Sequence, residues 1–228
     1  MGASMSMNAR LETASQLHAE SMDKMYGLQR HFYDLTRAYY LLGRDQLLKS
    51  LHVPENGTVL EVGCGTGRNL VAAAKLYPKA KFFGFDISHE MLRSAETSLQ
   101  RADIGNRAVL MQGDAERFDS QSLFGVAQFD RVYFSYTLSM IPDWQAALSQ
   151  AFRAVKPGGS LHVVDFGDCA RLPKTFKRVL YAWLNRFHVT PRLALETALG
   201  ELVSEDGGRV EVSRPFRSYA VIARVTKS

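Results

Sequence analysis

Cysteine is scarce in this chain, and long apolar runs are missing from it. Only Cys64 and Cys169 occur among the 228 residues. Two are too few for a disulfide framework, so we expect reduced thiols in a cytoplasmic protein. No stretch reaches the roughly 18 apolar residues that a membrane-spanning helix needs, and the N-terminus lacks the apolar core of a secretion signal. His, Asp and Glu do not recur at the spacing of metal ligands, so we predict no metal site.

What the chain does contain fits one α/β domain with a small extension. Its length lies in the range of such a domain, and no internal repeat or low-complexity tract interrupts it. Residues 1–20 begin small, polar and rich in Met, and we expect them to be flexible or to stem from expression. Residues 21–52 are predicted to form a helical lid, and residues 53–228 the main domain.

The most informative stretch runs from Val59 to Asn69. A short β-rich run ends there at three glycines in alternation between positions 63 and 67, and a helix-like segment follows at 70–76. Such glycines let the backbone turn sharply and a ligand approach, and the amides at the helix start then face that ligand. Arg68 stands where a G-x-G-x-x-G dinucleotide site requires glycine, and no Gly-Lys-Ser/Thr phosphate loop follows. Because Glu61 would repel a pyrophosphate, we expect a nucleotide-sized ligand with positive charge.

Further predicted strands also end in polar residues. The run Lys81–Asp86 ends in a carboxylate, and Ser88 is placed as the N-cap of a helix around residues 90–99. The runs 109–115, 129–136 and 159–165 follow the same pattern, and residues 209–227 contain a closing strand pair. Polar groups at strand ends mark the ligand crevice of an open α/β sheet, and an acid after its second strand can hydrogen-bond both ribose hydroxyls.

This set of motifs over residues 58–168 resembles the class I S-adenosylmethionine-dependent methyltransferases. The resemblance implies an α/β, Rossmann-like fold, with a mostly parallel seven-stranded sheet, helices on both faces and an N-terminal helical lid. It implies S-adenosylmethionine as the cofactor of the domain 53–228, with Asp86 on the ribose, Asp114 at the adenine amine, and Ser135 and Tyr136 at the methyl-transfer site. The cofactor-binding residues expected from it are Tyr40, Glu61, Gly63, Cys64, Gly65, Asp86, Ile87, Met91, Asp114, Ala115 and Ser135.

The segment from Ser21 to Asp45 is crowded with aromatic and cationic side chains. Apolar residues recur in it at three- and four-residue spacing, which predicts a helix with one buried face. Its tyrosines suit methylated ammonium groups through cation–π attraction, and its arginines suit carboxylates or phosphates. A lid that only packs on the core would not require this chemistry, so we expect substrate contacts here.

Several stretches carry a closer resemblance, namely residues 22–26, 29–31, 33–37, 39–45, 135–144 and 187–192. They look like the methyltransferase component of bacterial betaine-lipid synthase, and the match covers almost the whole chain beyond residue 20. That family methylates the amine of diacylglyceryl-homoserine three times to give diacylglyceryl-trimethylhomoserine. The implied reaction is attack of the lipid amine on the sulfonium methyl, with S-adenosylhomocysteine leaving, so that positioning is the main requirement.

A base could assist this reaction, with Asp34, Tyr136 and Asp165 as candidates. Loss of the proton to water is an equal alternative, because a free α-amino group has a pKa near ~8. Tyrosines are expected around the ammonium group and arginines at the homoserine carboxylate. The predicted catalytic residues are Tyr33, Tyr136 and Asp165, and the predicted substrate-binding residues are Tyr26, Arg30, Tyr33, Arg37, Tyr136, Ser139 and Arg192.

Residues 174–188 combine basic and large aromatic side chains without an acid. Such a helix can lie in an anionic membrane interface, which would place the protein peripherally on the inner face of the cell membrane. The alternative is an ordinary helix that packs its aromatic face on the sheet. No nucleic-acid-binding module is visible, so we expect no nucleic-acid partner.

Three interpretations of function follow. The favoured one is a betaine-lipid N-methyltransferase. The resemblance to that family implies a lipid substrate and an aminocarboxypropyl-transferase partner in the same pathway. The second is the same chemistry on phosphatidylethanolamine or a small amine. The third is a cofactor-binding protein that acts as a non-enzymatic partner.

Overall fold

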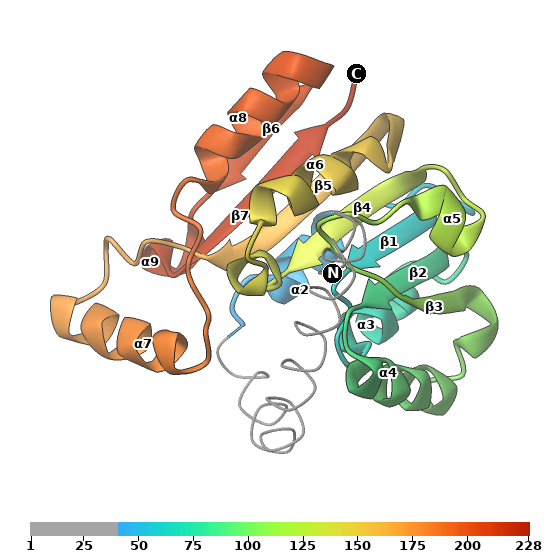
Figure 1. Ribbon diagram of the computed structural model, residues 1–228, viewed down its shortest axis with the longest axis horizontal. Coiled ribbons are helices and arrows are strands. Elements are labelled where there is room, and N and C mark those ends of the chain that lie inside the picture. Colours follow the sequence, from blue (N-terminus) through green and yellow to red (C-terminus); the bar gives the residue numbers. More distant parts are fainter. Residues whose placement is uncertain (1–40) are drawn as a thin grey trace, which may run out of the picture.

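The computed structural model describes residues 41–228, which form one seven-stranded sheet covered by helices (Figure 1). The strands lie in the order β3-β2-β1-β4-β5-β7-β6. β1 to β5 pair in parallel, and β7 runs antiparallel to both β5 and β6. The strands are β1 (Thr58–Val62), β2 (Lys81–Asp86), β3 (Ala108–Gln112), β4 (Phe129–Ser135), β5 (Val155–Phe166), β6 (Arg209–Ser213) and β7 (Ala220–Thr226). The predicted mostly parallel seven-stranded sheet is therefore confirmed.

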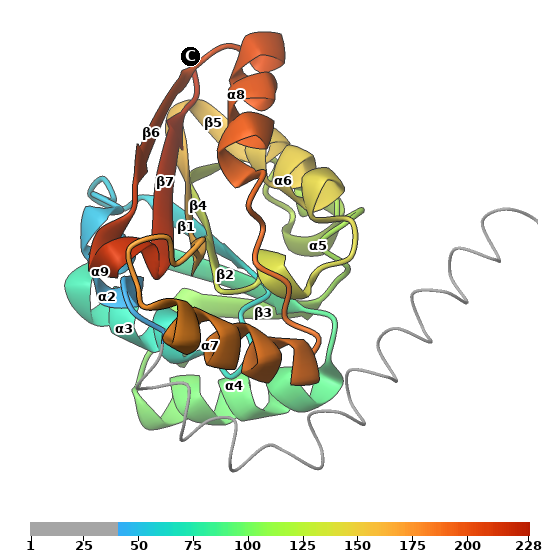
Figure 2. The same cartoon turned by 90° about the vertical axis from the view of Figure 1, so that its left-hand side faces the viewer.

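Helices cover both faces of this sheet, as Figures 1 and 2 show. A parallel sheet that is covered on both faces has strands that are buried over most of their length, as β1 and β4 are. Two hydrophobic clusters result, one on each face. One face carries α2 (Arg44–Ser50), α3 (Arg68–Leu76) and α4 (His89–Arg101), and the other carries α5 (Ser120–Phe124), α6 (Trp144–Arg153) and α8 (Leu195–Asp206).

The remaining elements lie near the ends of the strands. The 3₁₀ turns are η1 (Gly105–Arg107) and η2 (Leu138–Met140), and α7 (Lys174–Arg186) lies beyond the carboxyl end of β5 (Figure 1). α9 (Pro215–Ser218) precedes β7, and its residues Phe216, Arg217 and Ser218 have φ angles of 55°, 57° and 64°. Three successive non-glycine residues in the left-handed region are uncommon. The amides of Gly167 and Cys169 support this turn by donating to the carbonyls of Tyr219 and Ser218, both at 2.8 Å.

Local sequence patterns predicted where α4 and α3 begin to within two residues. Ser88 caps α4 as predicted, because its side chain accepts a hydrogen bond from the Met91 amide at 3.3 Å. The helix expected over 70–76 begins two residues earlier, at Arg68. Of the predicted lid, only residues 41–52 are described, and they contain α2 with Leu47 and Leu48 buried. Among the described residues, no helix has the length and apolarity required to cross a membrane.

Candidate functional site

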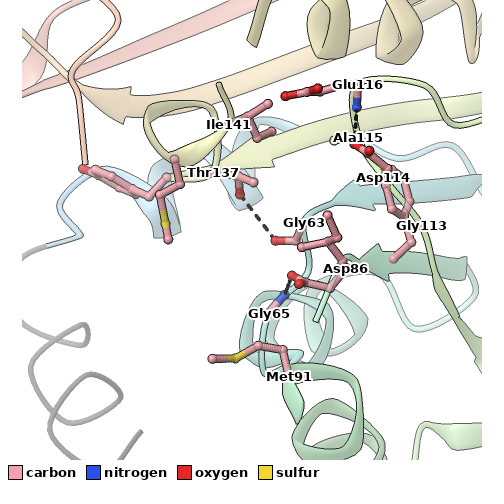
Figure 3. A pocket seen from close by; sticks show the side chains of 14 residues that line it. Gly63, Gly65, Asp86, Met91, Gly113, Asp114, Ala115, Glu116, Thr137 and Ile141 are labelled. Carbon is pink, nitrogen blue, oxygen red and sulfur yellow. Dashed lines mark hydrogen bonds between the residues drawn. The ribbon is translucent and has the colours of Figure 1, made fainter. Parts of the chain in front are cut away.

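The glycine loop after β1 has a backbone that other residues adopt with difficulty. Gly63, Gly65 and Gly67 have φ angles of 70°, 52° and 74°. A Cβ atom on Gly63 would lie 2.2 Å from Cγ2 of Thr137, and Thr137 Oγ1 donates to the Gly63 carbonyl at 3.4 Å (Figure 3). The loop therefore combines positive φ angles with a close approach to the residues after β4, and both features require glycine.

Asp86 joins this loop to the next helix. One oxygen of its carboxylate accepts the Gly65 amide at 2.8 Å (Figure 3). The other accepts the Ser88 amide at 3.0 Å. The residue lies at the carboxyl end of β2 and lines a pocket. A carboxylate in this place can also accept hydrogen bonds from vicinal hydroxyl groups of a ligand.

The pocket lies at the carboxyl ends of β1 to β4 and contains about 640 Å³ of space, open solvent at its mouth included. Its charged lining residues are Asp86, Asp114 and Glu116, and no described Lys, Arg or His lines it. Carboxylates favour positive charge nearby, so the walls suit a cationic ligand with an apolar body. The lining residues are Gly63, Gly65, Phe85, Asp86, Ile87, Met91, Gly113, Asp114, Ala115, Glu116, Tyr136, Thr137, Met140 and Ile141.

One wall of the pocket consists of the loop after β3. Asp114 accepts the Glu116 amide at 3.0 Å and pairs with Arg117 at 3.0 Å. Glu116 in turn accepts the amide of Asp143 at 2.9 Å, and Asp143 caps α6. The loop after β3 is thus tied to the loop after β4, and the two enclose the pocket from one side. Glu116 was not predicted from the sequence.

Two residues expected to contact the cofactor lie beneath the glycine loop and do not line the pocket. Glu61 is buried, and its oxygens accept from Asn69 Nδ2 at 2.7 Å and from the Tyr133 hydroxyl at 3.0 Å. The carboxylate thereby fixes the start of α3 against β4. Cys64 is also buried, and burial followed by the nearby Asp86 and Glu61 charges raises its pKa well above the ordinary value. Its thiol is therefore neutral near pH 7 and is no nucleophile.

The opposite wall follows β4 and begins with Tyr136. This residue has a φ of 57°, is 1% exposed, and donates its hydroxyl to the Leu42 carbonyl at 2.5 Å. Burial, and then the charge of Asp165, raises the pKa of its phenol far above the usual range. The phenol is neutral at physiological pH, which leaves the ring rather than a phenolate for contact with a ligand. Ser135, which was also expected to contact the cofactor, precedes it and does not line the pocket. Its buried hydroxyl has no hydrogen-bond partner in the described part of the chain.

Ser139, Asp165 and Arg192 lie behind this wall rather than in it. The Asp165 carboxylate accepts the amides of Ser139 at 2.9 Å and of Phe166 at 2.7 Å. Burial raises the pKa of Asp165 to about 6, although these hydrogen bonds oppose the shift. Arg192 donates to the carbonyls of Leu138 at 3.0 Å and Ile141 at 2.5 Å. These three residues position the loop that contributes Met140 and Ile141 to the pocket.

The structure brings together most of the predicted cofactor residues and adds others. Gly63, Gly65, Asp86, Ile87, Met91, Asp114 and Ala115 all line the pocket, together with Tyr136. Thr137, Met140 and Ile141 were missed, because only their position after β4 marks them. The predicted Tyr26, Arg30, Tyr33, Arg37 and Tyr40 lie outside the described residues.

Comparison with known proteins identifies the class. Residues 54–197 match the family described as "Methyltransferase domain". A demethylmenaquinone methyltransferase of Geobacillus kaustophilus is 28% identical over 215 residues, which cover 90% of this chain and 84% of that protein. The protein of the same name from Lactiplantibacillus plantarum is 32% identical over 119 residues, 52% of this chain, so that the match spans about half (48%) of that relative's length. The sequence resemblance to the betaine-lipid family finds no support in these relatives.

Solved structures agree on the fold. An O-methyltransferase family protein from Burkholderia thailandensis superimposes with a TM-score of 0.67 at 18% identity, covering 86% of this chain and 59% of that one. The S-adenosylmethionine-dependent methyltransferase SibL gives 0.66 at 22% identity, with 88% and 59% covered.

The pocket fits S-adenosylmethionine by its own chemistry. Its acidic walls suit the sulfonium and ammonium charges, and the glycine loop leaves room for a ligand backbone. The chain therefore belongs to the methyltransferase-domain family and is a class I S-adenosylmethionine-dependent methyltransferase.

Proposed function

We propose that this enzyme N-methylates a lipid amine, with diacylglyceryl-homoserine as acceptor and the trimethylated betaine head group as final product. S-adenosylmethionine supplies the activated methyl group. The observation that carries the proposal is the composition of the pocket. Its ionisable lining residues are three carboxylates and the phenol of Tyr136, with no described His, Lys, Arg or Cys.

An amine acceptor suits such a pocket because it brings its own nucleophile. With a pKa near ~8, an α-amino group is partly neutral at physiological pH and can lose its proton to water. Each methyl group that is added leaves a cation, and carboxylates and an aromatic ring stabilise cations. The Tyr136 hydroxyl keeps its proton and donates a hydrogen bond to the Leu42 carbonyl, and Asp165 lies behind the wall, so neither is required as a base.

The choice of a lipid amine rests on the sequence motifs at residues 135–144 and 187–192, which resemble the betaine-lipid family. The structure places these two motifs in contact, because the Thr190 amide donates to the Ser139 carbonyl at 2.8 Å and Arg192 donates to Leu138 and Ile141. The motifs that the resemblance singles out therefore meet at the wall of the pocket.

A second candidate is methylation of a quinone acceptor. The relatives named demethylmenaquinone methyltransferase favour it, since one of them aligns with 90% of this chain. The apolar part of the lining, with Met91, Met140 and Ile141, would accept a hydrophobic ring as well as a lipid head group.

An acceptor panel separates the two. Purified protein with S-adenosylmethionine is offered diacylglyceryl-homoserine, phosphatidylethanolamine, a small primary amine and reduced demethylmenaquinone, and products are measured by mass spectrometry. We expect stepwise gain of one, two and three methyl groups on diacylglyceryl-homoserine. Methylation of the quinone alone would refute the proposal, and so would absence of product on diacylglyceryl-homoserine, which would place the acceptor elsewhere. Asp86→Ala serves as the control that removes cofactor contacts.

A further inference from the structure

Helix α7 presents an outward face that combines cations with exposed apolar side chains. Its sequence from Lys174 to Arg186 contains four basic residues and no acid. Arg178, Ala182 and Arg186 recur at four-residue spacing and therefore share one face of the helix. Phe176 and Val179 border that face and are 46% and 69% exposed. Large apolar side chains beside unpaired cations are typical of helices that lie in a membrane interface.

The opposite side of α7 already anchors the helix to the protein. Leu184 is buried in the hydrophobic cluster on the α2–α4 face of the sheet, and Leu180 and Tyr181 pack against the same cluster. The Tyr181 hydroxyl donates to the Gly167 carbonyl at 3.3 Å, and the ring lies 5.3 Å from Lys177 Nζ. Packing of α7 on the body of the protein, the alternative expected for this segment, is thus present, but it uses only one side of the helix. Phe176 and Val179 are not among the residues that pack against this cluster.

The chain that leaves α7 leads directly to the wall of the pocket. Residues 187–194 connect α7 to α8, and within them the Thr190 amide and the Arg192 guanidinium bind the carbonyls of the loop after β4. That loop supplies Met140 and Ile141 to the pocket. Leu193, in the same connection, is 63% exposed. Figure 2 shows α7 lying at the edge of the sheet that is formed by the carboxyl ends of the parallel strands.

We propose that the outward face of α7 docks on the surface of an anionic lipid bilayer and thereby brings the mouth of the pocket to the lipid. Lys174, Arg178 and Arg186 contact lipid phosphates, while Phe176 and Val179 enter the interfacial layer. The positive charge of this face, which no acidic residue offsets, complements an anionic surface. Its apolar side chains add binding free energy by leaving water for the bilayer interface. The inference rests on the proposed lipid acceptor for its purpose, but its test needs no turnover.

The test is sedimentation of the full chain with vesicles, without cofactor. Vesicles of phosphatidylcholine alone are compared with vesicles that also contain phosphatidylglycerol. We expect binding to the anionic vesicles only. The triple substitution K174Q/R178Q/R186Q should reduce it about a hundredfold, at roughly a factor of five per cation, and high salt should reduce wild-type binding as well.

Two further variants make the result specific. The matched control K49Q/R101Q/R153Q removes the same charge from exposed positions on α2, α4 and α6, and it should bind like the wild type. F176S/V179S keeps every cation and should still weaken vesicle binding about tenfold or more. Circular dichroism and thermal unfolding check that all variants are folded.

Each other outcome counts against the inference. Equal loss in the α7 triple variant and in the control would show an unspecific charge effect. Full binding by F176S/V179S, together with charge-dependent binding to RNA, would indicate a polyanion surface instead. Failure here is separable from failure of the proposed function. Turnover on detergent-dispersed diacylglyceryl-homoserine without vesicle binding would refute only the docking surface. Vesicle binding without turnover on any lipid amine would refute only the acceptor.

Discussion

At the scale of single residues, Gly63 is the most constrained position of the pocket. It combines a φ of 70° with a neighbour, Thr137 Cγ2, that would lie 2.2 Å from an added Cβ atom. Gly63→Ala should therefore displace Thr137 from the pocket wall and strain the loop, at a cost of about 1–3 kcal/mol in unfolding free energy. We expect at least a tenfold loss of S-adenosylmethionine affinity, measured by calorimetry, together with a lower melting temperature.

Gly105→Ala is the matched control, because an added Cβ atom there meets no atom within 4 Å. It should bind the cofactor like the wild type. If the two variants bound S-adenosylmethionine equally well, the close approach between the glycine loop and Thr137 would not be required for binding.

Predictions from sequence worked for residues whose role is set by their own segment. Asp86 and Asp114 were predicted because each stands at the end of a predicted strand, and both line the pocket in the structure. Glu61 was expected to face the ligand, yet Tyr133, 72 positions away, accounts for one of its hydrogen bonds. Glu116 was missed for the same reason, since its partner Asp143 lies in another loop. Contacts between distant segments leave no local pattern.

At the scale of elements, the connection from α7 to α8 controls the shape of the pocket through Arg192. The guanidinium binds the carbonyls of Leu138 and Ile141 and lies over the ring of Trp144. Arg192→Ala should release the loop after β4, and we expect KM for both the cofactor and the acceptor to rise about tenfold. Steady-state kinetics with each substrate varied in turn measures this.

The predicted pairing of Arg192 with an acceptor carboxylate would give a different pattern. In that case only KM for the acceptor would rise, and the affinity for S-adenosylmethionine would stay unchanged. Arg153→Ala, exposed on α6, is the control that removes an arginine without touching the loop or the outward face of α7.

Helices and strands could be predicted where their own residue composition indicates them. Their bounds were harder to predict where they depend on pairing with a distant segment. The strand predicted over residues 159–165 is longer in the structure than expected. β5 begins at Val155 and includes the two glycines at 158 and 159 that were expected to form a turn before it. Gly158 and Gly159 exchange backbone hydrogen bonds with Lys227, at the far end of the chain. The left-handed turn α9 was not predicted. Its residues Phe216, Arg217 and Ser218 have positive φ angles, but none of them is a glycine, which is the residue type that indicates such angles in a sequence.

At the scale of the whole molecule, Asp165 couples folding stability to pH. It lies fully buried at the end of β5, opposite Val221 of β7 and between the two hydrophobic clusters. Burial raises its pKa to about 6 in the folded protein, whereas an unfolded chain has the ordinary value near ~3.9. The folded state therefore binds the proton more tightly, and this contribution to stability is complete below about pH 4 and is lost as the pH rises through 6.

Urea unfolding of the wild type and of Asp165→Asn between pH 4 and pH 8 tests this coupling. The neutral amide cannot titrate, so the wild-type unfolding free energy should fall relative to the variant by up to about 3 kcal/mol between pH 4 and just above pH 6, and then stay level. The exposed Asp103→Asn controls for removal of a carboxylate. Parallel curves for the wild type and Asp165→Asn would mean that the pKa of Asp165 in the fold is not raised above its unfolded value. Its two amide partners, Ser139 and Phe166, would then outweigh the cost of burying the charge.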